Sequence, residues 1–346
     1  MIVTGSHLLK EHGMTINEIR KDGFKIESTF SMFSKNHKDT SGNMANSFGK
    51  AIINLSKIIE KLNPDIVFAG FDIAANFAAA IVGAHMNILV AHLEGGEVSG
   101  TIDESIRHAT TKFAHMHFTT NKIASERLIK MGENPKFIYV VGNPSLDNIK
   151  TIKKIPKKIL EKEFSINFSK PLILLMQHTV TSEVTTLEKY IQETIDAIRE
   201  LDVQCICILG NNDSGSKIIS KAIKKSKIKQ FSHISFKKYI NLLRNSDVLI
   251  GNSSSGIMEA PFLHIPSINI GTRQFGRVRS KSTIDVDYDK QMIKEALLKS
   301  LKNIKFQKIV DSTPSLYGDG CAAKRIVKIL EDIDLNSIPI QKQLSY

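Results

Sequence analysis

The sequence predicts an α/β protein with two lobes in tandem, each a parallel sheet with helices on its faces. Three observations lead to this prediction: short apolar runs alternate with longer amphipathic ones, the alternation stops once and restarts, and most apolar runs end in glycine or polar residues. At 346 residues the chain is long enough for two ordinary domains. The hydrophobic content of 42% and the charged content of 24% are typical of a globular protein.

The first lobe is expected over residues 1–150. Its apolar runs of strand length are 65–70, 88–96 and 116–120, and its runs of helix length are 74–85 and 101–114. Repeated strand–helix–strand units form a parallel sheet. The apolar stretch 66–90 is interrupted by Asp72, Asn76 and His85, so we interpret it as strand, helix and strand and expect no membrane span.

The second lobe is expected over residues 151–319, after a basic, turn-rich link at 143–164. The strands predicted beyond the link are 171–179, 204–212 and 246–254. A final helix at about 320–335, opened by a glycine pair, is expected to pack back on the first lobe. Ligands of open parallel sheets bind beyond the carboxyl ends of the strands, so a cleft between two such lobes is the expected site.

Charge and cysteine content indicate the kind of partner and the cellular location to expect. The net charge of +12 favours anionic partners, although a lysine-rich solvated surface is the simpler explanation. No basic stripe is interleaved with aromatic residues, so we expect no nucleic-acid partner. Three cysteines are too few and odd in number for a disulfide framework, and no signal peptide is visible, which together predict a cytoplasmic location.

Three carboxylates of the first lobe are the strongest candidates for chemistry. Asp72 and Glu94 each follow a predicted strand beside glycine, where an acid has little use as a helix cap. Asp103 opens the next predicted helix, where capping or a favourable charge at the helix dipole is an equal explanation. Carboxylates that share a site push each other's pKa apart, which gives an acid and a base at one pH. This edge of the sheet therefore predicts proton-transfer chemistry.

The other titratable residues of the same stretch have weaker cases. Glu104 and His108 stand four residues apart, which predicts a surface pair on the helix. The role of Glu97 stays open.

A strand end in the second lobe predicts a phosphate site. The motif GNSSSGIMEAPF follows an apolar run and precedes a predicted helix, whose free N–H groups and dipole favour an anion. Its serines are Ser253, Ser254 and Ser255. A plain serine cap is the alternative, but a cap needs one hydroxyl. Glu259, one to two turns into the predicted helix, could accept hydrogen bonds from ribose hydroxyls.

Further strand ends carry groups suited to the same ligand. His178 ends the run LILLMQH and is expected to face the cleft, although strand-end histidines are often structural. The loop GTRQFGRVRS supplies Arg273, Arg277 and Arg279, which suit bidentate phosphate contacts or a solvated turn equally. The loop GNNDSGS at 210–216 offers amide and hydroxyl donors, with an Asx-turn as the alternative.

The stretches HLEGGEVSGTIDESIRH, GNSSSGIMEAP and INIGTRQFGRVR together resemble the UDP-N-acetylglucosamine 2-epimerase family. The similarity runs from VTGSHLLKEHGMTINEI to YGDGCAAKRI and so covers essentially the whole chain. The wording GGEVSGTIDESIRHA resembles the hydrolysing branch, which makes N-acetylmannosamine and UDP for sialic acid synthesis.

The resemblance implies a glycosyltransferase-B-like fold of two Rossmann-like lobes, with UDP held mainly by the second. It implies anti elimination of UDP across C1–C2 to a glycal, then addition of water at C1 and return of a proton to C2 from the opposite face. It implies no metal, no cofactor and a homodimer or homotetramer. The implied acid–base group is Asp72, Glu94 and Asp103, with His178 against the UDP-sugar. The implied UDP-contacting set is Asn211, His233, Ser253, Ser254, Glu259 and Arg273.

The chain departs from the family pattern in three places. Ile73 stands where the family has a phosphate-side arginine, and Thr179 stands where the histidine motif often continues with proline. The family also begins with a strand and a glycine–arginine loop before the VTGSH strand, so we expect the first lobe to lack its first strand and helix. That strand would be central, and we expect its loss to expose apolar faces or repack the sheet and to weaken the activity.

Three alternatives stay open. UDP-2,4-diacetamido-2,4,6-trideoxyglucose, on the route to legionaminic acid, could replace UDP-N-acetylglucosamine as the substrate. A glycosyltransferase of the same fold would use the UDP site without proton exchange at C2. A nucleotide-sugar-binding protein without turnover would fit a chain that lacks the first strand. Which carboxylate acts as base and which as acid is not assigned.

Overall fold

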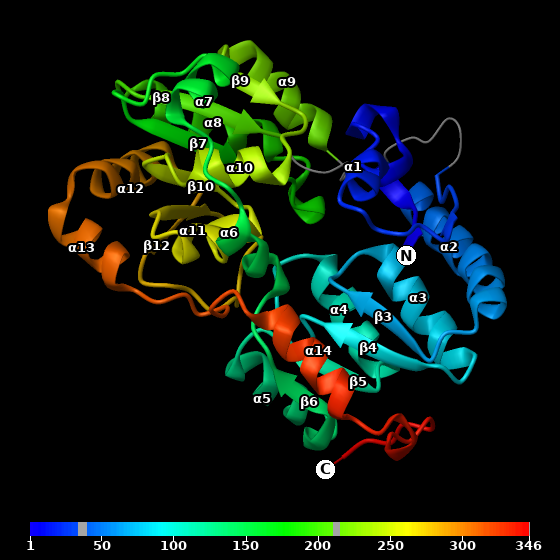
Figure 1. The fold of residues 1–346 in the computed structure, drawn as a ribbon. Coiled ribbons are helices and arrows are strands. Elements are labelled where there is room, and N and C mark those ends of the chain that lie inside the picture. Colours follow the sequence, from blue (N-terminus) through cyan, green and yellow to red (C-terminus); the bar gives the residue numbers. More distant parts are fainter. Residues whose placement is uncertain (34–39, 210–214, 346) are drawn as a thin grey trace. The chain divides into compact units, whose positions relative to one another are not determined.

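The computed structural model describes residues 1–33, 40–209 and 215–345, which form two compact units (Figure 1). Unit 1 comprises Met1–Glu97, Ile102–Gly142 and Lys324–Tyr346, and unit 2 comprises Val98–Thr101 and Asn143–Ala323. Each unit is therefore assembled from segments that are distant in the sequence. Residues 143–150, which we expected in the first lobe, belong to unit 2.

The described part of unit 1 contains two parallel sheets instead of the single sheet expected. Its strands are β1 (Ile2–Val3), β2 (Ser28–Thr29), β3 (Ile66–Gly70), β4 (Leu89–Leu93), β5 (Met116–Thr119) and β6 (Ile138–Val140). β1 pairs with β2, and the other four strands form a sheet in the order β3-β4-β5-β6. β4 ends at Leu93, so the strand predicted at 88–96 is shorter and Glu94 lies in the turn that follows it.

The described helices of unit 1 are α1 (Ile16–Lys21), α2 (Ser41–Leu62), α3 (Ala74–His85), α4 (Ile102–Phe113), α5 (Lys122–Lys130) and α14 (Ala322–Asp332), the last of which begins in unit 2. α2 and α3 pack on one face of the four-stranded sheet, and α14 packs on the other. The short 3₁₀ turns are η1 (Gly5–Leu8), η2 (Lys10–His12), η3 (Pro135–Phe137) and η7 (Leu335–Ser337). Thr40 caps α2 by accepting a hydrogen bond from the Asn43 N–H.

Alternate strand residues of unit 1 enter two separate cores. Val90 packs in a cluster with Leu55 and other side chains of α2 and α3, whereas Leu89 and Ala91 pack in a cluster with Ile326 of α14. This division follows from the period of two along a strand, which sends successive side chains to opposite faces. β4 is thereby buried on both sides, as expected for a parallel sheet.

The buried carboxylate of Glu133 joins three parts of unit 1. Its oxygens accept hydrogen bonds from Lys112 Nζ at 2.9 Å and from Lys342 Nζ, and they hydrogen-bond His117 Nε2 at 3.1 Å. Lys342 Nζ also donates to the Thr111 carbonyl at 2.7 Å, in the last turn of α4. Burial alone would raise the pKa of Glu133, but its bonds to His117 and Lys342 outweigh burial and lower that pKa to about 2.

Unit 2 contains a six-stranded parallel sheet among its described residues. Its strands are β7 (Leu172–Met176), β8 (Gln204–Ile208), β9 (Lys229–Phe231), β10 (Val248–Gly251), β11 (Ser267–Ile270) and β12 (Thr283–Val286). Their spatial order is β12-β11-β10-β7-β8-β9. The chain thus fills one side of the sheet from β7 to β9 and then returns past β7 to begin the other side. This order creates a topological switch point between β7 and β10, where ligands of such sheets bind.

Helices enclose the sheet of unit 2 on both faces. They are α6 (Asp147–Thr151), α7 (Lys157–Phe164), α8 (Leu187–Arg199), α9 (Ser216–Ser226), α10 (Phe236–Leu243), α11 (Glu259–Phe262), α12 (Lys290–Lys302) and α13 (Ile304–Ser312). The 3₁₀ turns are η4 (Pro144–Leu146), η5 (Thr181–Glu183) and η6 (Ser254–Gly256). Ile173 and Leu174, neighbours in β7, enter the two opposite cores. Residues 143–164, predicted as a link, instead form two helices, and Leu160 of α7 is fully buried.

No described helix of either unit combines the length and apolar character needed to cross a membrane. The three cysteines are free thiols.

Replacing Glu133 by glutamine should destabilise unit 1. Loss of one partner from a fully buried ion pair costs about 3–5 kcal/mol, and solvent access to the lysines should reduce the effect to about 2 kcal/mol at pH 7. The pKa of Glu133 falls from 4.5 to about 2 on folding. The ionised carboxylate therefore stabilises the fold fully above about pH 4.5, and this contribution is lost as the pH falls toward 2.

Urea denaturation of both proteins at pH 7 and at about pH 3 measures this effect. The difference in free energy of unfolding should shrink at the lower pH. Glu126→Gln, an exposed change on α5, is the matched control and should leave stability unchanged. An equal loss for Glu133→Gln at both pH values would contradict the assignment.

Candidate functional site

Asp72 and Glu94 lie beyond neighbouring strand ends in unit 1. Gly70 of β3 pairs with Leu93 of β4. Glu94 directly follows Leu93, and Asp72 follows Gly70 after one intervening residue. Phe71 and Glu94 have φ angles of 64° and 62°, in the left-handed region that side chains other than glycine rarely adopt. Strained backbone of this kind is concentrated at functional sites.

A buried arginine of α4 contacts Asp72. Arg107 is fully buried, and its Nη2 pairs with Asp72 Oδ2, whereas its Nε and Nη1 have no hydrogen-bond partner among the described residues. Asp103 precedes Arg107 by four residues on α4 and therefore lies on the same face of the helix. The structure thus brings the three predicted carboxylates to one edge of unit 1.

The last turn of α4 is tied to β4 beneath it. Thr111 Oγ1 hydrogen-bonds His92 Nδ1 of β4 at 3.2 Å. Burial of the His92 ring holds its pKa well below the usual value, so the imidazole is neutral at pH 7. On the outer face, His108 Nε2 lies 3.5 Å from Glu104 Oε1, which confirms the predicted surface pair.

Asn252 organises the switch point of unit 2. Its Oδ1 accepts a 2.6 Å hydrogen bond from the His178 N–H, and its Nδ2 donates to the His178 carbonyl at 2.9 Å. Its own carbonyl accepts from Arg273 Nη1 at 3.2 Å and from Gln274 Nε2 at 2.8 Å. Gly251 before it has a φ of 129° and lies against the Met176 carbonyl, so a side chain cannot be accommodated there.

His178 is a neutral imidazole in this setting. Burial of the ring and, secondly, the positive charge of Arg273 lower the pKa of His178 to about 3. Its Nδ1 has no hydrogen-bond partner among the described residues. A neutral ring can donate or accept one hydrogen bond to a ligand without adding charge.

The serine motif forms a different local structure from the helix predicted after it. Ser253 caps the 3₁₀ turn η6 by accepting from the Ser255 N–H at 3.3 Å. Ser255 is 6% exposed, and its hydroxyl hydrogen-bonds the Tyr239 hydroxyl, so it serves an internal contact. Ser253 and Ser254 stay partly exposed. Anion binding here would depend on hydroxyl and backbone donors more than on a helix dipole, because α11 has only four residues.

Glu259 begins α11 and does not lie one to two turns inside a helix, which corrects the prediction. Burial raises the pKa of Glu259, and hydrogen bonding to Ser255 and the charge of Arg277 partly oppose this. Its Oε2 is buried without a hydrogen-bond partner among the described residues. A ligand hydroxyl could satisfy that oxygen.

The arginines predicted as phosphate ligands all make contacts within unit 2. Arg277 is 8% exposed, and its Nε donates to the Val98 carbonyl at 2.9 Å. The Arg273 carbonyl accepts from the Gly100 N–H at 2.9 Å. Val98–Thr101 is thereby bound to the loop after β11. Arg279 Nε pairs with Asp285 at 2.6 Å.

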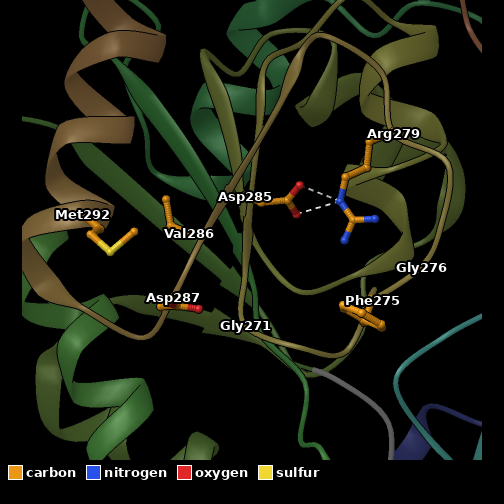
Figure 2. A pocket seen from close by; sticks show the side chains of 8 residues that line it. All are labelled: Gly271, Phe275, Gly276, Arg279, Asp285, Val286, Asp287 and Met292. Carbon is orange, nitrogen blue, oxygen red and sulfur yellow. Dashed lines mark hydrogen bonds and ion pairs between the residues drawn. The ribbon is translucent and has the colours of Figure 1, made fainter.

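A pocket of about 470 Å³ lies at the carboxyl ends of β11 and β12 (Figure 2). Its lining residues are Gly271, Phe275, Gly276, Arg279, Asp285, Val286, Asp287 and Met292. Figure 2 shows Arg279 directed at Asp285 across the loop, with Phe275 beside Gly276. Phe275 is 74% exposed. This pocket stands beside the outer strands, whereas His178 and Asn252 stand at the switch point between β7 and β10.

The other predicted residues have different outcomes. His233 follows β9 and is exposed. Asn211 lies outside the described residues. No group of three or more histidine, cysteine, aspartate or glutamate side chains in the described structure is placed to hold a metal ion.

A family model described as UDP-N-acetylglucosamine 2-epimerase matches residues 1–331. The chain belongs to the UDP-N-acetylglucosamine 2-epimerase family. It is 35% identical to the UDP-N,N'-diacetylbacillosamine 2-epimerase (hydrolyzing) of Legionella pneumophila, over 99% of this chain and 90% of that protein. It is 32% identical, with the same coverage of both proteins, to the UDP-N-acetylglucosamine 2-epimerase of Neisseria meningitidis.

Solved structures of this family share the fold of the epimerase chain. A crystal structure of UDP-GlcNAc 2-epimerase from Neisseria meningitidis, bound to UDP-GlcNAc, superposes with a TM-score of 0.82 at 19% identity. That match covers 93% of this chain and 90% of the other. A Listeria monocytogenes structure gives 0.80 at 22% identity, over 96% and 88% of the two chains. The predicted glycosyltransferase-B-like fold is therefore confirmed, whereas the predicted weakening by a missing strand finds no support in the comparisons.

Sequence reasoning missed two residues of the candidate site. Arg107 stands four residues after Asp103, so the i,i+4 rule could have placed it on the same helix face. Asn252 stands between a strand and the serines, and strand-end asparagines are common in turns. Its contacts to His178 join residues 74 positions apart, which no local pattern indicates.

Replacing Asp72 by asparagine should destabilise the fold because it leaves the Arg107 guanidinium buried without an anion. The expected loss is about 3 kcal/mol in the free energy of unfolding. The double variant Asp72→Asn/Arg107→Met should recover most of that loss, since an apolar side chain carries no uncompensated charge. Urea denaturation measures both, and equal instability of the single and double variants would contradict the ion pair's role.

Replacing Asn252 by aspartate should also destabilise the fold. The change puts a carboxylate oxygen where Nδ2 now donates to the His178 carbonyl, and the expected cost is about 1–3 kcal/mol. Asn336→Asp, at an exposed position, introduces the same charge and should cost little. Equal stability of the two variants in thermal unfolding would contradict the stabilising role of the hydrogen bonds between Asn252 and His178.

Proposed function

We propose that this chain is a hydrolysing 2-epimerase that converts a UDP-linked 2-acetamido sugar and water to the free 2-epimeric sugar and UDP. The observation that carries the proposal is the group of carboxylates at the edge of unit 1. Asp72 and Glu94 stand at neighbouring strand ends beside strained backbone, and Arg107, four residues after Asp103 on α4, pairs with Asp72. Membership of the family supports the reaction class.

The chemistry requires two proton transfers at C2. A carboxylate accepts the C2 proton while the C1–O bond breaks, and UDP leaves with the bonding electron pair. The glycal that remains has a C1–C2 double bond. Water then adds its hydroxyl to C1 and gives its other proton to a carboxylate, while a carboxylic acid on the opposite face gives a proton to C2, which inverts that centre. Each positioned acid or base contributes about 10²–10⁴ in rate.

The groups of unit 2 suit the anionic half of the substrate. Ser253 and Ser254 offer partly exposed hydroxyls beside backbone N–H groups. Arg273 follows β11, and its Nη1 donates to the carbonyl of Asn252 beside the serines, so it adds a positive charge there; the neutral His178 can donate one hydrogen bond. Removing UDP needs donors placed where negative charge develops on its oxygen. These contacts support UDP as the leaving group.

The sugar is the finer part of the proposal, and two candidates remain. UDP-N-acetylglucosamine fits the sequence resemblance and the name of the Neisseria relative. UDP-N,N'-diacetylbacillosamine is favoured by the names of the Legionella relative and of a Campylobacter jejuni relative that is 34% identical over 82% of this chain. A UDP-release assay with both sugars in competition decides, because the preferred sugar has the larger kcat/KM.

Location and assembly belong to the same proposal. The free thiols of Cys205, Cys207 and Cys321 agree with a cytoplasmic enzyme. A homodimer or homotetramer is proposed from the family resemblance, and light scattering of the purified protein tests it.

The reaction run in D₂O tests the proposed function. Product from the wild-type enzyme should carry one deuterium at C2, seen by mass spectrometry and proton NMR. Asp103→Asn should lower kcat by about 10² or more and leave the Kd for UDP nearly unchanged. Ser254→Ala should weaken UDP binding about tenfold and leave residual turnover.

Two outcomes would contradict this proposal. Product without deuterium at C2 would indicate a transferase or a simple hydrolase that never breaks the C2–H bond. Equal losses of UDP affinity in the Asp103 and Ser254 variants would contradict the division of roles between the carboxylates and the serines.

A further inference from the structure

Glu97 is a buried carboxylate that the proposed proton transfers leave unused. It is 2% exposed and stands three residues after Glu94, at the end of the turn that follows β4. Burial of a carboxylate is costly unless hydrogen bonds compensate it. Its partners therefore indicate what the side chain does.

The Glu97 carboxylate accepts two hydrogen bonds from described residues, and both come from the turn between β5 and α5. Its Oε1 accepts from Thr120 Oγ1 and from Asn121 Nδ2, the latter at 2.7 Å. Asn121 is itself fixed, because its Oδ1 accepts from the Ala124 N–H at 2.9 Å and so caps α5. Glu97 thus attaches the turn after β4 to the capped start of α5.

The rest of the turn Glu94–Glu97 is attached to the same two elements. The Glu94 N–H donates to the Phe118 carbonyl of β5 at 3.0 Å. Arg127 of α5 donates to the Gly96 carbonyl. Gly96 has a φ of 80° and approaches the Ala124 carbonyl too closely for any side chain. The turn is therefore held from β5 and α5 along its whole length.

We propose that Glu97 is a positioning residue that fixes Glu94 by anchoring the turn to Thr120 and Asn121, and that it exchanges no proton with the substrate. The proposal rests on the proposed function, in which Glu94 is an acid or base. Glu94 holds a left-handed backbone conformation that costs energy, so the surrounding contacts must maintain it. Displacement of a reacting group by about 1 Å costs about 10² in rate.

Glutamine at position 97 separates positioning from proton exchange. Both hydrogen bonds of Glu97 end on Oε1, and the amide oxygen of Gln can accept the same two bonds. A proton-exchanging carboxylate cannot be replaced in this way. The variants are Glu97→Gln, Glu97→Ala and Thr120→Val, with Glu126→Ala on the exposed face of α5 as control.

The readouts are kcat and KM with the UDP-sugar, and hydrogen exchange of the peptide covering residues 93–98 in the ligand-free protein. Glu97→Gln should keep kcat within about threefold and exchange as slowly as the wild type, whereas Glu97→Ala should lose about 10² in kcat with a small change in KM. Thr120→Val keeps the carboxylate, and its kcat and exchange rate should lie between those of Glu97→Gln and Glu97→Ala. The control should behave as the wild type.

A loss of kcat in Glu97→Gln as large as that in Glu97→Ala would overturn the proposal and make Glu97 an acid or base. Unchanged exchange at residues 93–98 in both Glu97→Ala and Thr120→Val would overturn it as well. If the wild type turns over no UDP-sugar, the proposed function fails, but hydrogen exchange still decides whether Glu97 anchors the turn. Should Glu97→Ala not fold, Thr120→Val gives the same test.

Discussion

The ion pair between Asp72 and Arg107 is the contact on which the proposed acid–base edge of unit 1 depends. It joins Asp72, which lies just beyond the end of β3, to α4, the helix that also carries Asp103. Because the guanidinium is fully buried, water offers it no alternative partner. Lys342 binds the last turn of the same helix. A helix held at its middle and at its last turn presents its first-turn carboxylate in one place, and placement is what acid–base catalysis requires.

The two units differ in the groups that form their candidate sites. In unit 1 the buried side chains of Glu133 and Arg107 are each compensated by an opposite charge. Unit 2 builds its switch point from amides, hydroxyls and the neutral ring of His178, arranged around Asn252. Fixed neutral donors bind an anion without the desolvation cost of a buried cation, so the division suits proton transfer in one unit and phosphate binding in the other.

Local sequence patterns predicted strands of both sheets and the residues that lie at their ends. The alternation of apolar runs placed β3, β4 and β7 and, with them, the strand-end positions of Asp72 and Glu94. Contacts between distant residues were not predictable, because nothing in GNSSSG indicates that Asn252 holds a backbone 74 residues away. The helix predicted after the serines proved to be a 3₁₀ turn and a single short helix, because tertiary contacts of the Ser255 hydroxyl override the cap pattern.

The Lys342 contact with Glu133 has a consequence for biosynthesis. A ribosome completes every residue of unit 2 before it makes Lys342, so unit 2 can form its sheet while Glu133 still lacks this cation. Until then the last turn of α4 also lacks one donor to its carbonyls. The order of synthesis therefore makes unit 1, which the chain starts first, the unit that is finished last, and a nascent chain stalled before residue 342 would expose α4 without its Lys342 contact to chaperones and proteases.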